Sequence, residues 1–105
     1  MNIRAVQSLV KKRKYRLTLH AENERDADKI TIEEIKAAFL SVKAEIIEDY
    51  PNDPRGQSCL ILGFTKQNRP VHIVCGIEDV VMLVVITVYR PDQGEWIGWK
   101  TRRRG

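Results

Sequence analysis

The chain has 105 residues, of which 43% are hydrophobic and 30% are charged, and its formal net charge is +4. This length suits a single domain that can bury a core without disulfides or structural metals. No apolar run reaches membrane-spanning length, and the basic N-terminus lacks the apolar segment of a signal peptide. We therefore expect a cytoplasmic protein with no membrane partner.

The charge is divided unevenly along the chain. Residues 1–19 carry six basic and no acidic side chains, residues 20–54 carry ten acids against four bases, and residues 55–105 carry eight bases against four acids. Basic ends can simply be solvated, or they can contact the phosphates of a nucleic acid without sequence specificity. Charge alone leaves both interpretations open.

The first residues are predicted to form a basic arm over residues 1–14, in which residues 2–10 can form one short helix. Residues 15–19 alternate apolar and polar side chains, which predicts a short edge strand. A second helix is expected from His20, because residues 20–29 are good helix formers and are acidic near their start.

Thr31 and Glu34 have the spacing of a capping box, which predicts the start of a third helix. The residues that follow at helical spacing should face the core; they are Ile35, Ala38, Phe39 and Val42.

From residue 45 onwards, the chain is predicted to hold four successive strands, at residues 45–50, 58–65, 71–76 and 80–90. Consecutive strands with short links form an antiparallel meander. The last strand is almost continuously apolar, so we expect it to be buried on both faces in mid-sheet. With two or three helices on one face, the result is an α+β fold with a four- to five-stranded sheet, a domain over residues 15–99 and a basic tail over residues 100–105.

The two cysteines, Cys59 and Cys75, lie within apolar strand patterns. They are predicted to be small core residues in a reducing compartment, and a disulfide between neighbouring strands is the less favoured alternative.

The two histidines are candidates for acid/base chemistry. His20, Glu24 and Asp28 recur every four residues, so a helix would place them on one face. This spacing fits a metal or acid/base pair, but a helix start with solvated acids is favoured from spacing alone. His72 lies in mid-strand, where a lone histidine is more often structural than catalytic. If the two histidines converge, one could act as base and the other as acid.

The end of the last strand carries further candidates. Tyr89 could donate a hydrogen bond or simply pack with its hydroxyl exposed, and Thr87 is typical of a strand. Arg90 is either an edge charge or a phosphate clamp. Trp96 and Trp99 could stack on bases, although covering a sheet edge is the commoner use of such side chains.

Several motifs are missing from the sequence. It contains no Gly-rich phosphate loop, no CxxC, no Walker lysine and no G-x-S-x-G. We therefore expect no cofactor, and a metal site built from His20, Glu24 and His72 is only a minor alternative.

Four segments together resemble a small prokaryotic domain family of unknown function, numbered 4258. They are LHAENERDADKITIEEI, IIEDYPNDPRGQSCLILGFT, RPVHIVCG and VVITVYRPDQGEW. The resemblance covers residues 15–99, and its most specific parts are HA at His20, RPVH at His72 and ITVYRPD ending at Asp92. Many members carry arginines where this chain has Glu24 and Asp28, which suggests a subgroup whose helix bears carboxylates.

That family is similar, more remotely, to the RelE-like and barnase-like ribonuclease toxins. The similarity implies a RelE-like fold, metal-independent cleavage of RNA and an antitoxin protein as partner. The residue roles that it implies are His72 and His20 as acid and base, Tyr89 and Thr87 orienting the phosphate, and Arg90, Arg25 and Trp96 contacting the substrate. Two alternatives stay open: a non-catalytic protein- or RNA-binding module, and a metal-dependent enzyme that uses His20, Glu24 and His72.

Overall fold

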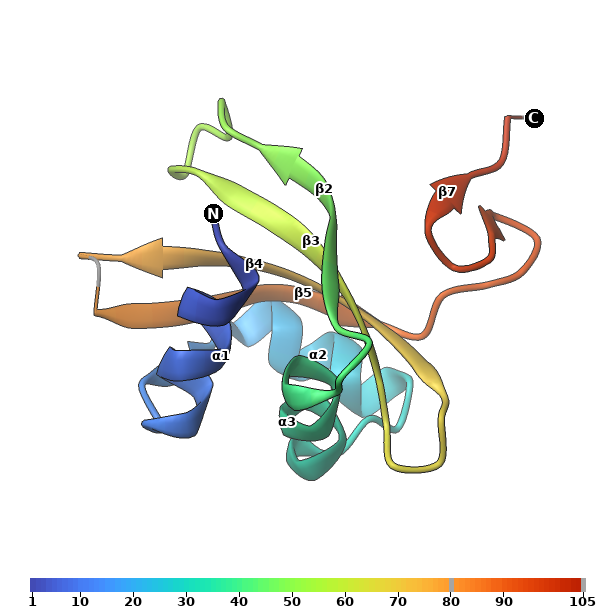
Figure 1. The fold of residues 1–105 in the computed structure, drawn as a ribbon, viewed down its shortest axis with the longest axis horizontal. Coiled ribbons are helices and arrows are strands. Elements are labelled where there is room, and N and C mark those ends of the chain that lie inside the picture. The colour runs from blue at the N-terminus through green and yellow to red at the C-terminus, as the bar shows by residue number, and fades with distance from the viewer. Residues whose placement is uncertain (80, 105) are drawn as a thin grey trace.

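The computed structural model describes residues 1–79 and 81–104. Its elements, in chain order, are α1 (Ile3–Lys11), β1 (Tyr15–Leu17), α2 (Leu19–Ala27), α3 (Ile32–Leu40), β2 (Glu45–Tyr50), β3 (Ser58–Phe64), β4 (Pro70–Glu78), β5 (Met82–Tyr89), β6 (Trp96–Ile97) and β7 (Thr101–Arg102). The three helices cover one face of a five-stranded sheet, and β6 and β7 form a small separate hairpin (Figure 1). The predicted α+β class is confirmed.

The strand order of the main sheet is β1-β5-β4-β3-β2. Strands β2 to β5 form the predicted antiparallel meander. Strand β1 lies at an edge, as predicted, but it runs parallel to β5, with Arg16 opposite Val84. The N-terminal strand β1 thus completes a sheet whose other strands all come from residues 45–89.

Each helix begins at a residue whose side chain accepts a backbone N–H. Thr31 and Glu34 form the predicted capping box, with two reciprocal hydrogen bonds of 3.0 Å. The Thr18 hydroxyl accepts from the Ala21 N–H, so α2 begins one residue earlier than predicted. Helix α3 ends at Leu40, before the predicted core residue Val42, which is fully exposed; that prediction was wrong.

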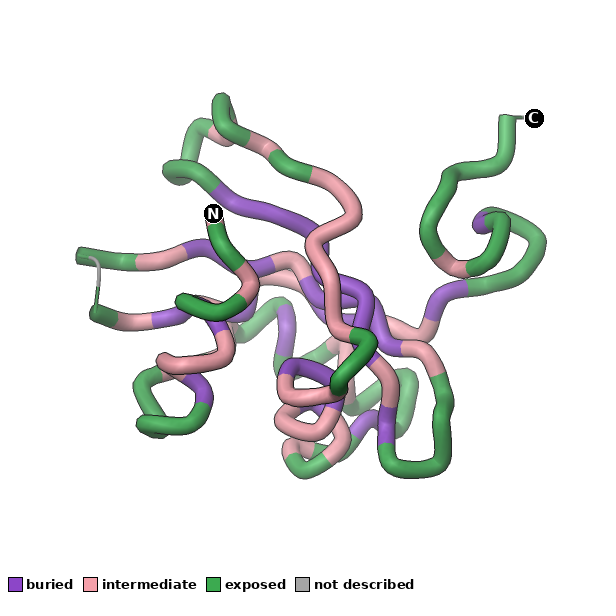
Figure 2. The backbone as a smooth tube through the Cα atoms, in the orientation of Figure 1, coloured by how far each residue is buried: buried purple, intermediate pink, exposed green. Residues whose placement is uncertain are grey.

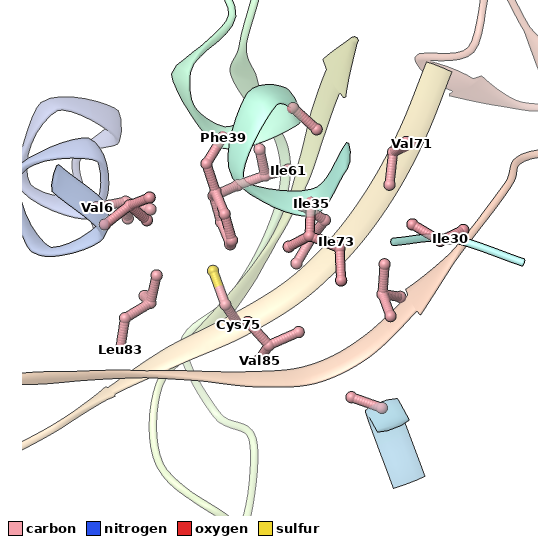
Figure 3. Close-up of a cluster of buried hydrophobic side chains, with 14 of the residues drawn as sticks. Val6, Ile30, Ile35, Phe39, Ile61, Val71, Ile73, Cys75, Leu83 and Val85 are labelled. Atoms are coloured by element: carbon pink, nitrogen blue, oxygen red, sulfur yellow. The ribbon is translucent and has the colours of Figure 1, made fainter. Parts of the chain in front are cut away.

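The core lies between the helices and the sheet (Figure 3). Helix α1 buries Val6 and Val10, although it belongs to the segment predicted as a basic arm. Cys59 and Cys75 are paired neighbours in β3 and β4, and both are buried free thiols as predicted. None of the helices in the described ranges is long and apolar enough to cross a membrane.

Close packing of α3 on β3 requires a glycine. A Cβ at Gly63 would lie 2.1 Å from the carbonyl oxygen of Ala38, so any side chain there would push the helix away from the sheet. This contact fixes the height of α3 above the sheet.

The prediction that the last strand is buried on both faces was wrong. In β5 the buried residues Leu83, Val85 and Val88 alternate with half-buried ones, because no helix covers the second face. Strand β3 is the one buried almost throughout (Figure 2). The last predicted strand was expected to begin at Val80, which lies outside the described residues.

Candidate functional site

Polar side chains gather on the sheet face that points away from the helices, called here the open face. Val71 and Ile73 belong to the core on the helix side, so His72 between them points to the open face. Tyr89 lies directly opposite His72 on β5, and β2 contributes Glu48.

Both ring nitrogens of His72 have partners, and the side chain is fully buried. Nε2 lies 2.7 Å from the carbonyl oxygen of Trp99, and Nδ1 lies 3.0 Å from the Tyr89 hydroxyl. A carbonyl can only accept, so a neutral His72 carries its proton on Nε2 and its Nδ1 accepts from Tyr89. Burial lowers the pKa of His72, which favours this neutral form.

Tyr89 is held in a desolvated position beside this imidazole. Burial raises the pKa of Tyr89 to about 12, so its hydroxyl is protonated at neutral pH. The Trp96 ring stands edge-on to His72, with 4.5 Å between the ring centroids, and it is 4% exposed. His72 and Tyr89 therefore form a rigid pair under the cover of Trp96.

Glu48 lies beside this pair and is bound by a cation and a phenol. Its carboxylate accepts from Arg102 Nε at 2.8 Å and Arg102 Nη2 at 3.0 Å, and it also accepts from the Tyr50 hydroxyl. Hydrogen bonding from Arg102 lowers the pKa of Glu48, so this carboxyl is ionised at neutral pH. Desolvation, followed by the bond to Glu48, raises the pKa of Tyr50. We call Glu48, Tyr50, His72, Tyr89 and Arg102 the open-face cluster.

Arg102 and both tryptophans come from the short segment that contains β6 and β7. This segment turns back over the open face (Figure 1) and is also tied to β2 by an ion pair of 2.9 Å between Lys100 and Glu45. The guanidinium of Arg102 lies 4.7 Å from the centre of the Trp96 ring, within cation–π range. The predicted basic tail thus supplies one residue of the cluster.

The structure does not bring His20 to His72. His20 is exposed on α2, in the helix layer, with Nε2 3.2 Å from Glu24 Oε1. Glu24 is partly buried and accepts the backbone N–H of Val88, and the exposed Asp28 accepts the backbone N–H of Arg90, so both carboxylates bind the end of β5 and the residue after it. Within residues 1–79 and 81–104, no three His, Cys, Asp or Glu side chains lie close enough together to hold a metal ion.

Arg90 also points to the helix side. Its Nε donates to the carbonyl oxygen of Asp28, and its Nη2 donates to the carbonyl oxygen of Lys29 and approaches Glu34 at 3.3 Å. It therefore ties β5 to the connection between α2 and α3, away from the open-face cluster.

The remaining predicted substrate contacts lie in two places. Arg25 donates to Glu22 at 2.7 Å and to the carbonyl oxygen of Ile30, both in the helix layer. Thr87 pairs with Val74 and lies on the open face, between β4 and β1 in the sheet. Of the predicted site residues, the structure brings together His72, Tyr89 and Trp96.

Sequence reasoning missed three members of the cluster. Glu48 and Tyr50 are two residues apart in a correctly predicted strand, so their common face was readable from the alternation. Arg102 carried no such signal, because only the fold of the hairpin brings it to β2.

Comparison with known proteins gives one match. The family model described as "Domain of unknown function (DUF4258)" matches residues 17–90. No curated protein and no solved structure matches the chain. The likeness to RelE-like and barnase-like toxins therefore stays a prediction.

Proposed function

The chain belongs to DUF4258, a domain family of unknown function, and we propose that it is a metal-independent endoribonuclease of the toxin type. The observation that carries this proposal is an ionised carboxylate, Glu48, held between the cation of Arg102 and a phenol on one partly exposed surface. An antitoxin-like protein that covers this surface belongs to the same proposal.

The proposed reaction assigns one role to each group. Glu48 takes the proton of the RNA 2′-hydroxyl, and the oxygen attacks phosphorus to form a 2′,3′-cyclic phosphate as the bond to the 5′-oxygen breaks. Tyr89 is protonated at neutral pH, and its hydroxyl leaves the hydrogen bond to His72 Nδ1 to give that proton to the leaving 5′-oxygen. Arg102 neutralises the charge that develops on the phosphate.

His72 is a positioning residue in this scheme. Both of its nitrogens are engaged and its side chain is fully buried, so it holds the Tyr89 hydroxyl and does not contact RNA itself. His20 has no role, because it lies in the helix layer with Glu24.

The test is cleavage of an end-labelled RNA in the presence of EDTA by the protein freed of any partner. We expect products ending in 2′,3′-cyclic phosphate and a loss of about 100-fold or more in rate for Glu48→Gln and for Tyr89→Phe. His20→Ala is the matched control and should cleave at the wild-type rate. Circular dichroism checks that every variant is folded.

Three results would overturn the proposal. If Glu48→Gln still cleaves RNA, Glu48 is not the general base. If His20→Ala loses cleavage, a catalytic group lies on α2. A folded wild-type protein that binds the RNA without cutting it would make the chain a non-catalytic RNA-binding module.

A further inference from the structure

A groove of about 310 Å³ lies on the open face next to the cluster. It lies in the cross-strand row that contains Tyr50, Ser58, Gly76, Val84 and Arg16, each paired with the next across the sheet. Tyr50 therefore belongs to the open-face cluster and to the row of the groove. Along β4, Gly76 is four residues from His72, or about 13 Å in an extended strand.

The floor of the groove is apolar, and no side chain of Gly76 projects into it. Val84 and Ile86 on β5 form it, and both are only half-buried. A Cβ on Gly76 would lie 3.0 Å from the carbonyl oxygen of Gln57 and 3.9 Å from the Ile86 side chain. The missing side chain of Gly76 keeps this space open, and the resulting flat apolar floor suits one face of a planar ring.

Two arginines stand at the walls of the groove. Arg55 is held by Asp53, which accepts from its Nε at 3.1 Å and its Nη2 at 3.0 Å, and the Ser58 hydroxyl donates to the same carboxylate at 2.8 Å. Arg16 donates through Nη2 to Glu78 at 2.8 Å. Each ion pair engages one side of a guanidinium, so both groups are oriented and keep further N–H donors for a ligand.

A run of cations connects α1, in the helix layer, to β1, whose Arg16 lines the groove. Residues 11–14, Lys-Lys-Arg-Lys, are exposed just before β1, and none forms an ion pair with an acid of the described chain. The backbone N–H of Leu83 donates to the carbonyl oxygen of Lys14 at 2.9 Å, which fixes the end of this run beside β5. The run and Arg16 carry five positive charges at the β1 edge of the sheet, which favours the approach of a polyanion.

We propose that the groove binds one nucleotide of a single-stranded RNA. The base lies on Val84 and Ile86, Arg16 and Arg55 bind its phosphates, and the neighbouring backbone follows residues 11–14. This site deepens the function proposed above by naming where the substrate strand lies, but it requires binding only and not cleavage.

The first test measures binding by the fluorescence anisotropy of a labelled short single-stranded RNA, with Glu48→Gln as the parent protein so that the RNA stays intact. We expect Arg16→Ala to weaken binding about tenfold to a hundredfold, the effect of losing one charged hydrogen-bonded contact. It should also reduce the dependence of log Kd on log salt by about one unit. Arg69→Ala, which removes an exposed arginine on the β3–β4 turn, is the matched control and should bind like the parent.

The second test does not depend on any substitution. Uridine 3′-monophosphate is added to the wild-type protein, and the amide resonances of Gly56, Gly76 and Val84 should shift. Shifts confined to other parts of the chain, or equal RNA binding by Arg16→Ala and Arg69→Ala, would overturn the groove as a nucleotide site. Binding of an acidic peptide in place of RNA would also overturn it.

The two proposals fail separately. If Arg16→Ala loses RNA binding while the wild-type protein does not cleave, the nucleotide site in the groove is supported and the ribonuclease proposal is wrong. If Arg16→Ala binds and cleaves like the wild type, cleavage stands and the groove falls.

Discussion

His72 is an imidazole whose proton position is set by two neighbours. The Trp99 carbonyl oxygen requires a proton on Nε2, and the Tyr89 hydroxyl occupies the lone pair of Nδ1. Protonating Nδ1 would reverse the second bond, so that Nδ1 donates to the Tyr89 oxygen, and it would place a charge in a fully buried position. The cost of that charge makes this residue sensitive to pH.

We predict that His72 makes the protein less stable as the pH falls from 7.5 to 5.5. Its pKa in the folded protein is lowered from 6.5, chiefly by burial, so the unfolded chain binds the proton first. The free energy of unfolding should fall by up to about 1.4 kcal/mol per pH unit below the unfolded pKa. Urea unfolding at several pH values measures this slope.

His72→Gln should flatten that slope between pH 7 and 5.5, whatever it does to stability at pH 7.5. His20→Gln, which changes an exposed histidine, should keep the wild-type slope. An unchanged slope in His72→Gln would show that the imidazole is not the titrating group.

The Arg90 side chain connects three secondary-structure elements, because its guanidinium joins the end of β5 to α2 and α3. It donates to the carbonyl oxygens of Asp28 and Lys29 beyond the end of α2, and it lies 3.3 Å from Glu34 in the first turn of α3. The backbone N–H of Thr31 is the largest cause that lowers the pKa of Glu34, and the Arg90 guanidinium lowers this pKa further.

We predict that Arg90→Lys lowers the free energy of unfolding by about 1 to 3 kcal/mol, because a lysine cannot reach these acceptors in the geometry of a planar fork. Chemical denaturation measures the loss. Arg69→Lys, at an exposed turn, should leave stability unchanged. Equal stability of the two variants would contradict the bridging role of Arg90.

The elements were readable from sequence where local signals exist. The capping box at Thr31 fixed the start of α3, and turn residues separated β2 to β5. The parallel pairing of β1 with β5 could not be predicted, because the sequence of a three-residue strand does not indicate which distant strand it pairs with. The same limit hid the role of Arg90, whose partners lie on two other elements.

Local stability should differ across the whole molecule, with the inner strands of the sheet more stable than the β6–β7 hairpin. Strands β3 and β4 lie inside the sheet, whereas the β6–β7 hairpin buries only Trp96 (Figure 2). Hydrogen exchange should therefore be slowest at Leu60 and Ile73 and at least about 100-fold faster in the hairpin. Protection of the hairpin equal to that of β4 would contradict this order, and nuclear magnetic resonance measures both.

The site shows the same division between local and long-range information. His72 and Tyr89 could be chosen from sequence because each is a polar residue in an apolar strand. The pairing of Glu48 with Arg102 could not be predicted, since the return of the hairpin to β2 brings these two residues together. The hydrogen bonds of Glu24 and Asp28 could not be predicted for a related reason: their donors are the backbone N–H groups of Val88 and Arg90, which lie far along the chain.

The position of β1 also has a consequence for synthesis on the ribosome. Tyr15 pairs with Leu83, so β1 has no partner in the main sheet until roughly 70 more residues have been made, which takes about 3 to 14 s at usual elongation rates. During that interval the apolar sides of α1 and α3, with Val6 and Phe39, have no complete sheet to cover. The nascent chain therefore exposes this apolar surface until β5 has left the ribosome and can pair with β1.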